Sequence, residues 1–132
     1  YAGIAFGNTG VGAVHALSYP LGGNYHVPHG ESNYQFFTAV FNLYNKKNPD
    51  GLIAELNEML RHIFKTAGNP YEALDALLEK LYHKKSLKEY GMLEKEIDDF
   101  TENVLLTQQR LLANNYVDLS KEEIRGLYKL LY

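Results

Sequence analysis

Apolar residues recur at three- and four-residue intervals along most of this chain, and no stretch alternates with the two-residue period of a strand. Such spacing places side chains along one face of an α-helix. Three segments also begin with sequences that cap helices, namely Asn69-Pro70, Ser86-Leu87-Lys88-Glu89 and Ser120-Lys121-Glu122-Glu123. The sequence therefore predicts a single all-α domain over residues 1–132.

Helices are expected from His29 to about Tyr44, from Asp50 to the stop at Gly68, from Asn69 onward, from about Leu93 with a bend before Leu111, and from Ser120 to the end. Asp50 is expected to cap the second of these helices. That helix carries the most regular stripe of the chain, and we expect the stripe to be buried: Leu52, Ile53, Leu56, Met59, Leu60, Ile63 and Phe64.

The first 25 residues contain no Lys, Arg, Asp or Glu, which invites comparison with a signal peptide or a membrane span. Glycines and asparagines interrupt the apolar run, no basic segment precedes it, and a span needs about 20 predominantly apolar residues. We therefore expect a buried central helix of a soluble domain.

Composition limits the classes of partner and site. A formal charge of −3 offers no basic surface, which argues against nucleic acid and against anionic membrane as partners. The absence of cysteine excludes disulfides and thiolate–metal sites, and it is compatible with the reducing cytoplasm. Any metal ion must therefore bind to His, Asp or Glu.

Two histidines, His15 and His29, lie fourteen residues apart on either side of Pro20-Leu21-Gly22-Gly23. We expect His15 to lie near the end of one helix and His29 to open the next. Positive φ at Gly22 and Gly23 would form the turn between them and bring both imidazoles to one point. Two converging histidines are either a metal-ligand pair or hydrogen-bonded core residues, and the spacing leaves both alternatives open.

Two segments resemble the second signature of the iron-containing (group III) alcohol dehydrogenases. They are Ala13-Val14-His15-Ala16-Leu17-Ser18-Tyr19-Pro20-Leu21-Gly22-Gly23 and Pro28-His29-Gly30-Glu31-Ser32-Asn33. Together with Gln108-Gln109-Arg110-Leu111-Leu112-Ala113-Asn114-Asn115-Tyr116, they are similar to the 4-hydroxybutyrate dehydrogenase branch of that family. The resemblance implies the helical C-terminal domain of the dehydroquinate synthase-like fold. It also implies that an α/β dinucleotide-binding domain and the first metal-ligand helix precede Tyr1, so that the chain alone would be inactive.

The resemblance further implies site roles. His15 and His29 would bind Fe(II), with Zn(II) as the alternative, in an NAD(H)-dependent enzyme that interconverts 4-hydroxybutyrate and succinate semialdehyde. Tyr19, where many family members carry histidine, would lie near the nicotinamide with Gly22 and Gly23, as a catalytic phenol or as a structural wall. Asn24 and His26 are candidates for contact with substrate, and a partly exposed loop position is the alternative for His26.

Other interpretations remain open at this point. The chain could be a helical structural module without activity, or part of a related zinc polyol dehydrogenase or a dehydroquinate-synthase-like lyase. His62, four residues after Glu58, and His83 are expected to be solvated surface residues. Exposed apolar residues near the start, including Ile4, Phe6 and Val11, would favour a homo-oligomer.

Overall fold

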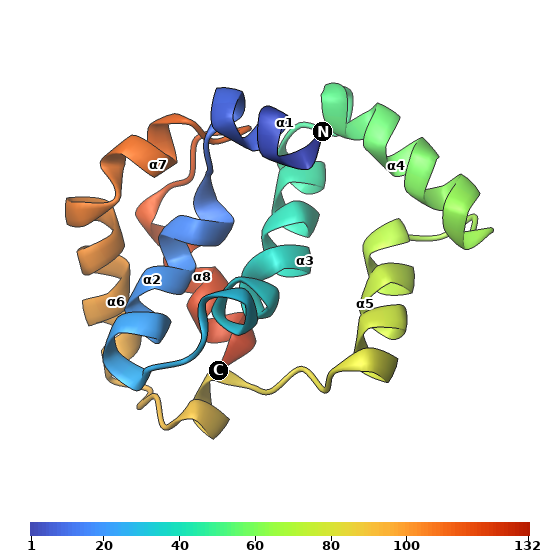
Figure 1. Ribbon diagram of the computed structural model, residues 1–132. Helices are drawn as coiled ribbons and strands as arrows, with labels where there is room; N and C mark the ends of the chain where they lie inside the picture. Colours follow the sequence, from blue (N-terminus) through green and yellow to red (C-terminus); the bar gives the residue numbers. More distant parts are fainter.

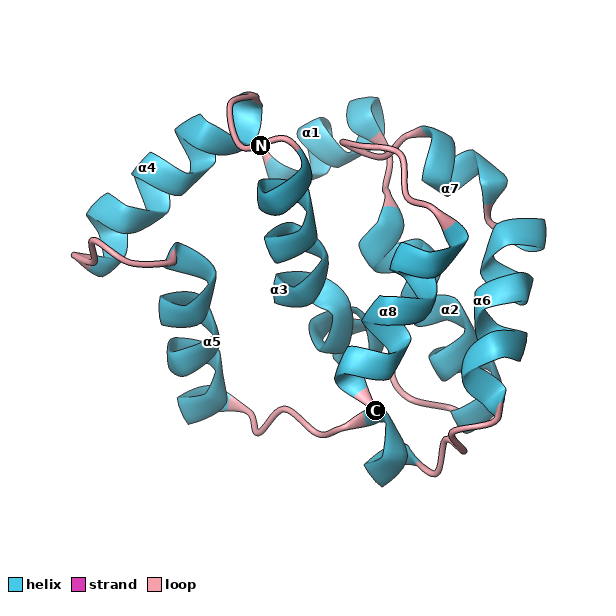
Figure 2. Ribbon diagram, turned by 180° about the vertical axis from the view of Figure 1, so that it is seen from behind, coloured by secondary structure: helices cyan, strands magenta, loops and turns pink.

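The computed structural model describes all 132 residues and consists of helices and connecting loops, with no strand (Figures 1 and 2). The prediction of an all-α fold is confirmed. The helices are α1 (Ala2–Thr9), α2 (Ala13–Tyr25), α3 (His29–Lys47), α4 (Leu52–Phe64), α5 (Pro70–Leu81), the short 3₁₀ helix η1 (Leu87–Tyr90), α6 (Glu96–Thr107), α7 (Gln109–Ala113) and α8 (Lys121–Leu131). None of these helices is both long enough and apolar enough to cross a membrane.

The core lies where α2, α3, α6 and α8 meet. Tyr128 of α8 is fully buried, and its ring makes edge-on contacts with Phe36 of α3 and Phe100 of α6, with centroids 5.4 and 5.8 Å away. Its hydroxyl donates a 2.7 Å hydrogen bond to the carbonyl oxygen of Leu17, so the one polar atom of the ring is satisfied. Burial of each such side chain contributes about 1.5–3 kcal/mol, which makes this cluster the anchor of α2.

Local capping chemistry predicted the start of three helices correctly. Asn69 Oδ1 accepts a 2.9 Å hydrogen bond from the N–H of Tyr71, and both capping boxes, at Ser86 and Ser120, are formed. The prediction for Asp50 was wrong, because α4 begins after Gly51 and no side chain caps it. The break at Gln108, between α6 and α7, confirms the expected bend before Leu111.

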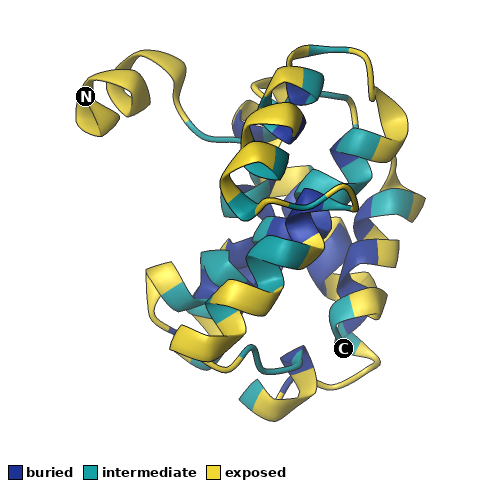
Figure 3. Cartoon of the chain, turned by 90° about the vertical axis from the view of Figure 1, so that its right-hand side faces the viewer, coloured by how far each residue is buried: buried dark blue, intermediate teal, exposed yellow.

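The charge-free N-terminal segment is not one central helix. Only α2 is buried, whereas α1 has no buried residue and stands away from the rest of the chain (Figure 3). The two helices are separated at Gly10, which has a φ of 70°. Asn114 donates hydrogen bonds to the carbonyl oxygens of Thr9 (2.6 Å) and Val11 (3.2 Å), the acceptors that a continuous helix would use for its own N–H groups.

The regular stripe of α4 is only partly buried, which contradicts the expectation that the whole stripe is buried. Only Ile53 and Asn57 of this helix are buried, whereas Leu52 is 75% exposed and Met59 and Ile63 are each 59% exposed. Helices α4 and α5 project together from the side of α3 (Figure 1), so α4 meets other helices along only part of its surface. Nothing else in the chain covers the rest of the stripe.

Candidate metal site

Helix α2 continues through the segment that was expected to be a turn. Pro20, Gly22 and Gly23 all lie inside it, and neither glycine has a positive φ. The chain instead reverses direction at His26, whose φ is 55°, and Pro28 precedes α3. The buried face of Ala16, Leu17 and Leu21 supplies packing energy that outweighs the local preference of proline and glycine for turns.

Gly22 has a packing role rather than a turn role. A Cβ atom at this position would lie 3.4 Å from the carbonyl oxygen of Val27 and 3.5 Å from Ser32 Oγ. The Ser32 hydroxyl donates a 3.2 Å hydrogen bond to that same carbonyl. The absence of a side chain therefore lets the connection between α2 and α3 pack directly against the helix.

The two predicted histidines do meet, although by a different route. His15 lies near the start of α2 and His29 is the first residue of α3. Because α2 and α3 run past each other in opposite directions (Figure 1), the reversal at His26 brings the His29 ring to within 5.1 Å of the His15 ring, centroid to centroid. The planes of the two rings are inclined by 51°.

Asn33, which the sequence analysis missed, aligns both rings. Its Nδ2 atom lies 3.1 Å from Nε2 of His15 and 3.1 Å from Nε2 of His29. One amide group carries two hydrogens, so it can donate one to each ring nitrogen. In this arrangement the Nε2 lone pair of each ring accepts from the same amide nitrogen.

Ser18 orients the Asn33 amide. The Ser18 hydroxyl lies 2.6 Å from Asn33 Oδ1 and 2.9 Å from the carbonyl oxygen of His15, and its single proton serves one acceptor at a time. The contact with Oδ1 leaves the amide nitrogen turned toward the imidazoles. A sequence signal was available, because Asn33 lies four residues after His29 on the same helix face.

The electrostatic environment favours the neutral form of His15. Burial, and secondarily the neighbouring His29 imidazole, lower the pKa of His15 below its ordinary value of 6.5. A neutral imidazole is the form that binds a metal ion. The Nε2 lone pair of His15 accepts from Asn33 here, and it would bind an ion when the amide turns aside.

The donor set fits part of a metal site. Two neighbouring imidazoles suit Fe(II), Zn(II) and related ions, and the Asn33 amide that bridges their Nε2 atoms would have to give way to the ion. A catalytic site generally uses three or more protein ligands, and no group of three His, Cys, Asp or Glu side chains in this chain is placed to hold one ion. The assignment of His15 and His29 as metal ligands stays a prediction that this geometry fits.

Tyr19 lies beside the histidine pair, one helical turn after His15. Its ring stacks on that of His29 with centroids 6.3 Å apart and planes inclined by 28°. The side chain is 42% exposed, and its hydroxyl makes no hydrogen bond within the chain. The phenol is therefore free to contact a bound molecule.

The remaining predicted residues lie near the far end of α2. Gly23, Asn24 and His26 are exposed, and they do not contact the histidine pair. Tyr25, the residue before His26, donates its hydroxyl to Glu96. The cofactor and substrate roles of Gly22, Gly23, Asn24 and His26 stay predictions.

Two other histidines are surface residues, as expected. His83 pairs with Glu79, and that carboxylate raises its pKa. His62 is exposed, and Glu58 pairs with Arg61 rather than with His62, at 2.5 Å. Neither histidine takes part in a cluster of ligands.

An open cavity of about 520 Å³ lies against His15. Its walls come from the loop between α1 and α2, from aromatic side chains of α3 such as Phe37, Phe41 and Tyr44, and from residues 114–116. Apart from His15, the lining contains no ionisable acid or base other than the tyrosines. The cavity therefore suits an uncharged chain of atoms near the histidine pair.

Comparison with known proteins agrees with this geometry. The model of the C-terminal domain of the Fe-containing alcohol dehydrogenase family matches residues 1–132. This chain belongs to that family. The 4-hydroxybutyrate dehydrogenase of Clostridium kluyveri is 58% identical over 133 residues, which cover 100% of this chain and 36% of that protein. The long-chain-alcohol dehydrogenase 1 of Geobacillus thermodenitrificans is 31% identical over 97% of this chain and 33% of its own length.

Solved structures show the same fold for this domain of the family. An archaeal halo-thermophilic alcohol dehydrogenase from a Red Sea brine pool superimposes with a TM-score of 0.80 and 25% identity, covering 100% of this chain and 35% of that chain. A 1,3-propanediol oxidoreductase superimposes with a TM-score of 0.78 and 23% identity, which concerns the fold alone. The chain spans about a third of the length of the relatives that it matches.

Proposed function

We propose that this chain is the helical metal-binding domain of an NAD-dependent dehydrogenase that interconverts 4-hydroxybutyrate and succinate semialdehyde. The observation that carries this proposal is the 58% identity to the Clostridium kluyveri 4-hydroxybutyrate dehydrogenase, which extends over the whole chain. The next relative, a long-chain-alcohol dehydrogenase, is 31% identical. This difference favours 4-hydroxybutyrate over a simple alcohol as the substrate.

In this proposal His15 and His29 hold a divalent metal ion through their Nε2 atoms. The family name favours Fe(II), and Zn(II) is the alternative, because imidazoles suit both ions. Further ligands would come from a part of the protein outside these 132 residues. When bound, the metal acts as a Lewis acid that lowers the pKa of the alcohol and polarises the carbonyl group of the aldehyde.

The residues of this chain would prepare the site before the ion and substrate arrive. Asn33 bridges the two Nε2 atoms and would turn aside when the ion binds, and the lowered pKa of His15 favours its neutral ring. The Tyr19 hydroxyl, free of protein partners and next to His29, would donate a hydrogen bond near the reacting oxygen. A phenol exchanges protons less readily near neutral pH than the histidine that many family members carry at this position.

NAD(H) would be held mainly by a dinucleotide-binding domain of the same protein, with Gly22 and Gly23 facing the nicotinamide end. The apolar cavity beside His15 would take the methylene chain of 4-hydroxybutyrate. The substrate carboxylate needs a cation or several donors, which this cavity lacks, so Asn24, His26 and residues of the other domain are the candidates. The absence of cysteine suits a cytoplasmic enzyme, and the exposed Ile4 and Phe6 of α1 favour a homo-oligomer.

Steady-state kinetics of the full-length protein would test this proposal. We expect NAD-dependent oxidation of 4-hydroxybutyrate with a kcat/KM at least about 100-fold above that for 1-propanol or 1-butanol, because a site that binds a carboxylate rejects a substrate without one. Dialysis against a chelator should abolish turnover, and Fe(II) or Zn(II) should restore it. Equal kcat/KM values for the acid and the simple alcohols would refute the substrate, and turnover that survives metal removal would refute the metal.

A further inference from the structure

We propose that Asn115 is a positioning residue for the metal site, because its side chain joins the two helices that carry His15 and His29. Asn115 belongs to the loop between α7 and α8, and it contacts neither histidine ring. It therefore acts on the histidines through the start of α2. The inference rests on the proposed function, since it assigns a role toward the ion that the histidines would hold.

One oxygen atom makes the connection. Asn115 Oδ1 accepts a 3.1 Å hydrogen bond from the backbone N–H of Ala13, the first residue of α2, two residues before His15. The same oxygen accepts a hydrogen bond from the hydroxyl of Tyr44, on the helix that begins with His29. The relative position of the two ligand helices is thus fixed by a polar contact at the end opposite to the His26 reversal.

No other group can take over this contact at the start of α2. The residue before the helix is Gly12, which has no side chain with which to cap it. A Cβ atom on Gly12 would lie 3.0 Å from Asn115 Oδ1, so the glycine is what lets the amide come close enough. Ala13 is fully buried, so removal of the Asn115 amide would leave its N–H without a protein acceptor.

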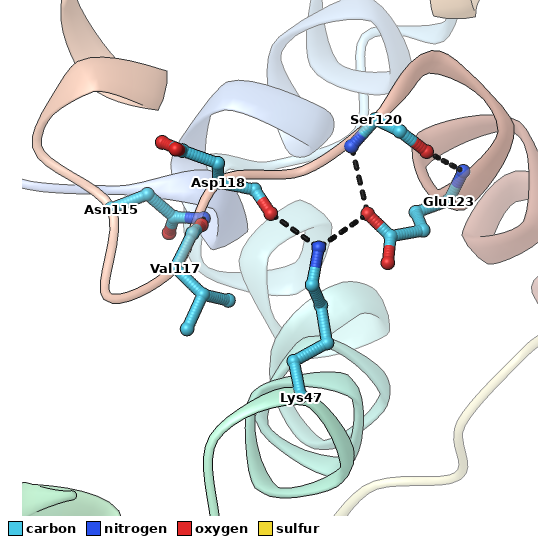
Figure 4. Close-up of polar contacts among 6 residues, drawn as sticks. All are labelled: Lys47, Asn115, Val117, Asp118, Ser120 and Glu123. Carbon is cyan, nitrogen blue, oxygen red and sulfur yellow. Dashed lines mark hydrogen bonds and ion pairs between the residues drawn. The ribbon is translucent and has the colours of Figure 1, made fainter.

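The loop that carries Asn115 is itself held on two sides (Figure 4). Asn115 Nδ2 donates to the carbonyl oxygen of Val117 at 2.7 Å. Lys47, the last residue of α3, donates to the carbonyl oxygen of Asp118 at 2.5 Å and to Glu123 Oε2 at 2.7 Å. The N–H of Ser120 donates to the same Glu123 oxygen at 2.7 Å, within the capping box of α8.

These hydrogen bonds hold the loop that carries Asn115 against α3 and α8. Lys47 connects the end of α3 to this loop and to α8, and Asn115 connects the loop to the first turn of α2. Loss of the Asn115 amide should therefore loosen the turn that presents His15, while the hydrophobic core around Leu17 remains packed. Mutation of groups that hydrogen-bond directly to metal ligands commonly weakens metal binding by about 10–100-fold, and we expect the lower end of that range for Asn115, which acts through the backbone.

The test compares the full-length Asn115→Ala protein with the full-length Asn69→Ala protein. Asn69 is a matched control, because its Oδ1 also accepts a backbone N–H at the start of a helix, at 2.9 Å, but α5 carries no predicted site residue. The dissociation constant for Zn(II) is measured by competition with a chromophoric chelator. We expect Asn115→Ala to weaken zinc binding at least about tenfold and Asn69→Ala to leave it within about twofold, with turnover of Asn115→Ala restored by excess metal.

Equal zinc affinities for the two variants would overturn the inference. If Asn115→Ala does not accumulate as folded protein, Tyr44→Phe removes only the α3 half of the contact and should weaken zinc binding about threefold; an unchanged affinity would then overturn it. The His29→Ala protein separates the two levels of the argument. If His29→Ala binds zinc as tightly as the wild type, the proposed function fails and the positioning role fails with it. If His29→Ala loses zinc affinity but Asn115→Ala binds zinc as tightly as the wild type, the positioning role alone is wrong.

Discussion

The α2–α3 pair and the α4–α5 pair are both made of consecutive helices, but they bury different parts of their surfaces. In α2, Ala13, Ala16, Leu17 and Leu21 are all fully buried, and α3 adds Phe36 and Val40. In α4 only Ile53 and Asn57 are buried, although its apolar stripe is the more regular of the two. A regular apolar stripe predicts that a segment forms a helix. How much of that helix is buried depends on the neighbouring elements that cover it. The candidate metal ligands lie on the well-covered pair, where rigid packing can hold two rings in register.

The largest expected difference between the two pairs is in the loss of stability that a Leu→Ala substitution causes in α2 and in α4. Leu17→Ala should lower the free energy of unfolding by about 2–5 kcal/mol, because Leu17 is fully buried. Leu52→Ala should lower it by less than about 0.5 kcal/mol, because Leu52 is 75% exposed. Urea denaturation of the full-length protein provides both values. Similar losses at the two sites would mean that another part of the protein covers the α4 stripe.

The second prediction concerns pH and compares metal-free proteins. The folded-state pKa of His15 lies below its ordinary value of 6.5, so the unfolded chain takes up a proton more readily than the folded chain. Stability should therefore be highest above about pH 6.5 and should fall as the pH drops below that value. Thermal unfolding midpoints at pH 7.5 and 5.5 should differ less for His15→Gln than for the wild type. The same difference in both proteins would show that His15 does not contribute.

The smallest effect is expected at Gly23, where the predicted turn proved to be helix. Gly23 is exposed, and an added Cβ atom would have no neighbour within 4 Å. Gly23→Ala should therefore raise the free energy of unfolding by about 0.5–1 kcal/mol, as expected for an exposed helical glycine. A clear loss of stability in the same denaturation experiment would indicate the turn conformation that the sequence had suggested.

The features that could be predicted from the sequence depend on nearby residues. Asn69, Ser86 and Ser120 cap helices through atoms two or three residues away, so their roles were evident without the fold. The course of α2 through Pro20 could not be predicted, because local preference favours a turn there and only the packing of the buried face overrides it. The exposure of α4 depends on which other elements pack against it, and the spacing of its apolar residues does not predict that.

In the candidate site, too, some features could be predicted from the sequence and others depend on how distant segments pack. The convergence of His15 and His29 was predicted, but for the wrong reason, since the chain reverses at His26 rather than at the glycines. Asn33 was missed although its spacing from His29 was a signal, whereas Asn115 acquires its role only where distant segments meet. Ala13 and Asn115, for example, are 102 residues apart in sequence. Asn115 was noted only as part of a family motif.

Metal analysis of histidine variants tests the central claim most directly, namely that the well-covered pair α2–α3 supplies two ligands of one metal site. Full-length wild type, His15→Ala, His29→Ala and the surface control His62→Ala are equilibrated with Fe(II) under anaerobic conditions, and the bound iron is counted per chain. We expect about one ion in the wild type and in His62→Ala, and a loss of nearly all bound iron in His15→Ala and His29→Ala, with NAD binding retained. Full iron stoichiometry in either of the two site variants would contradict the account.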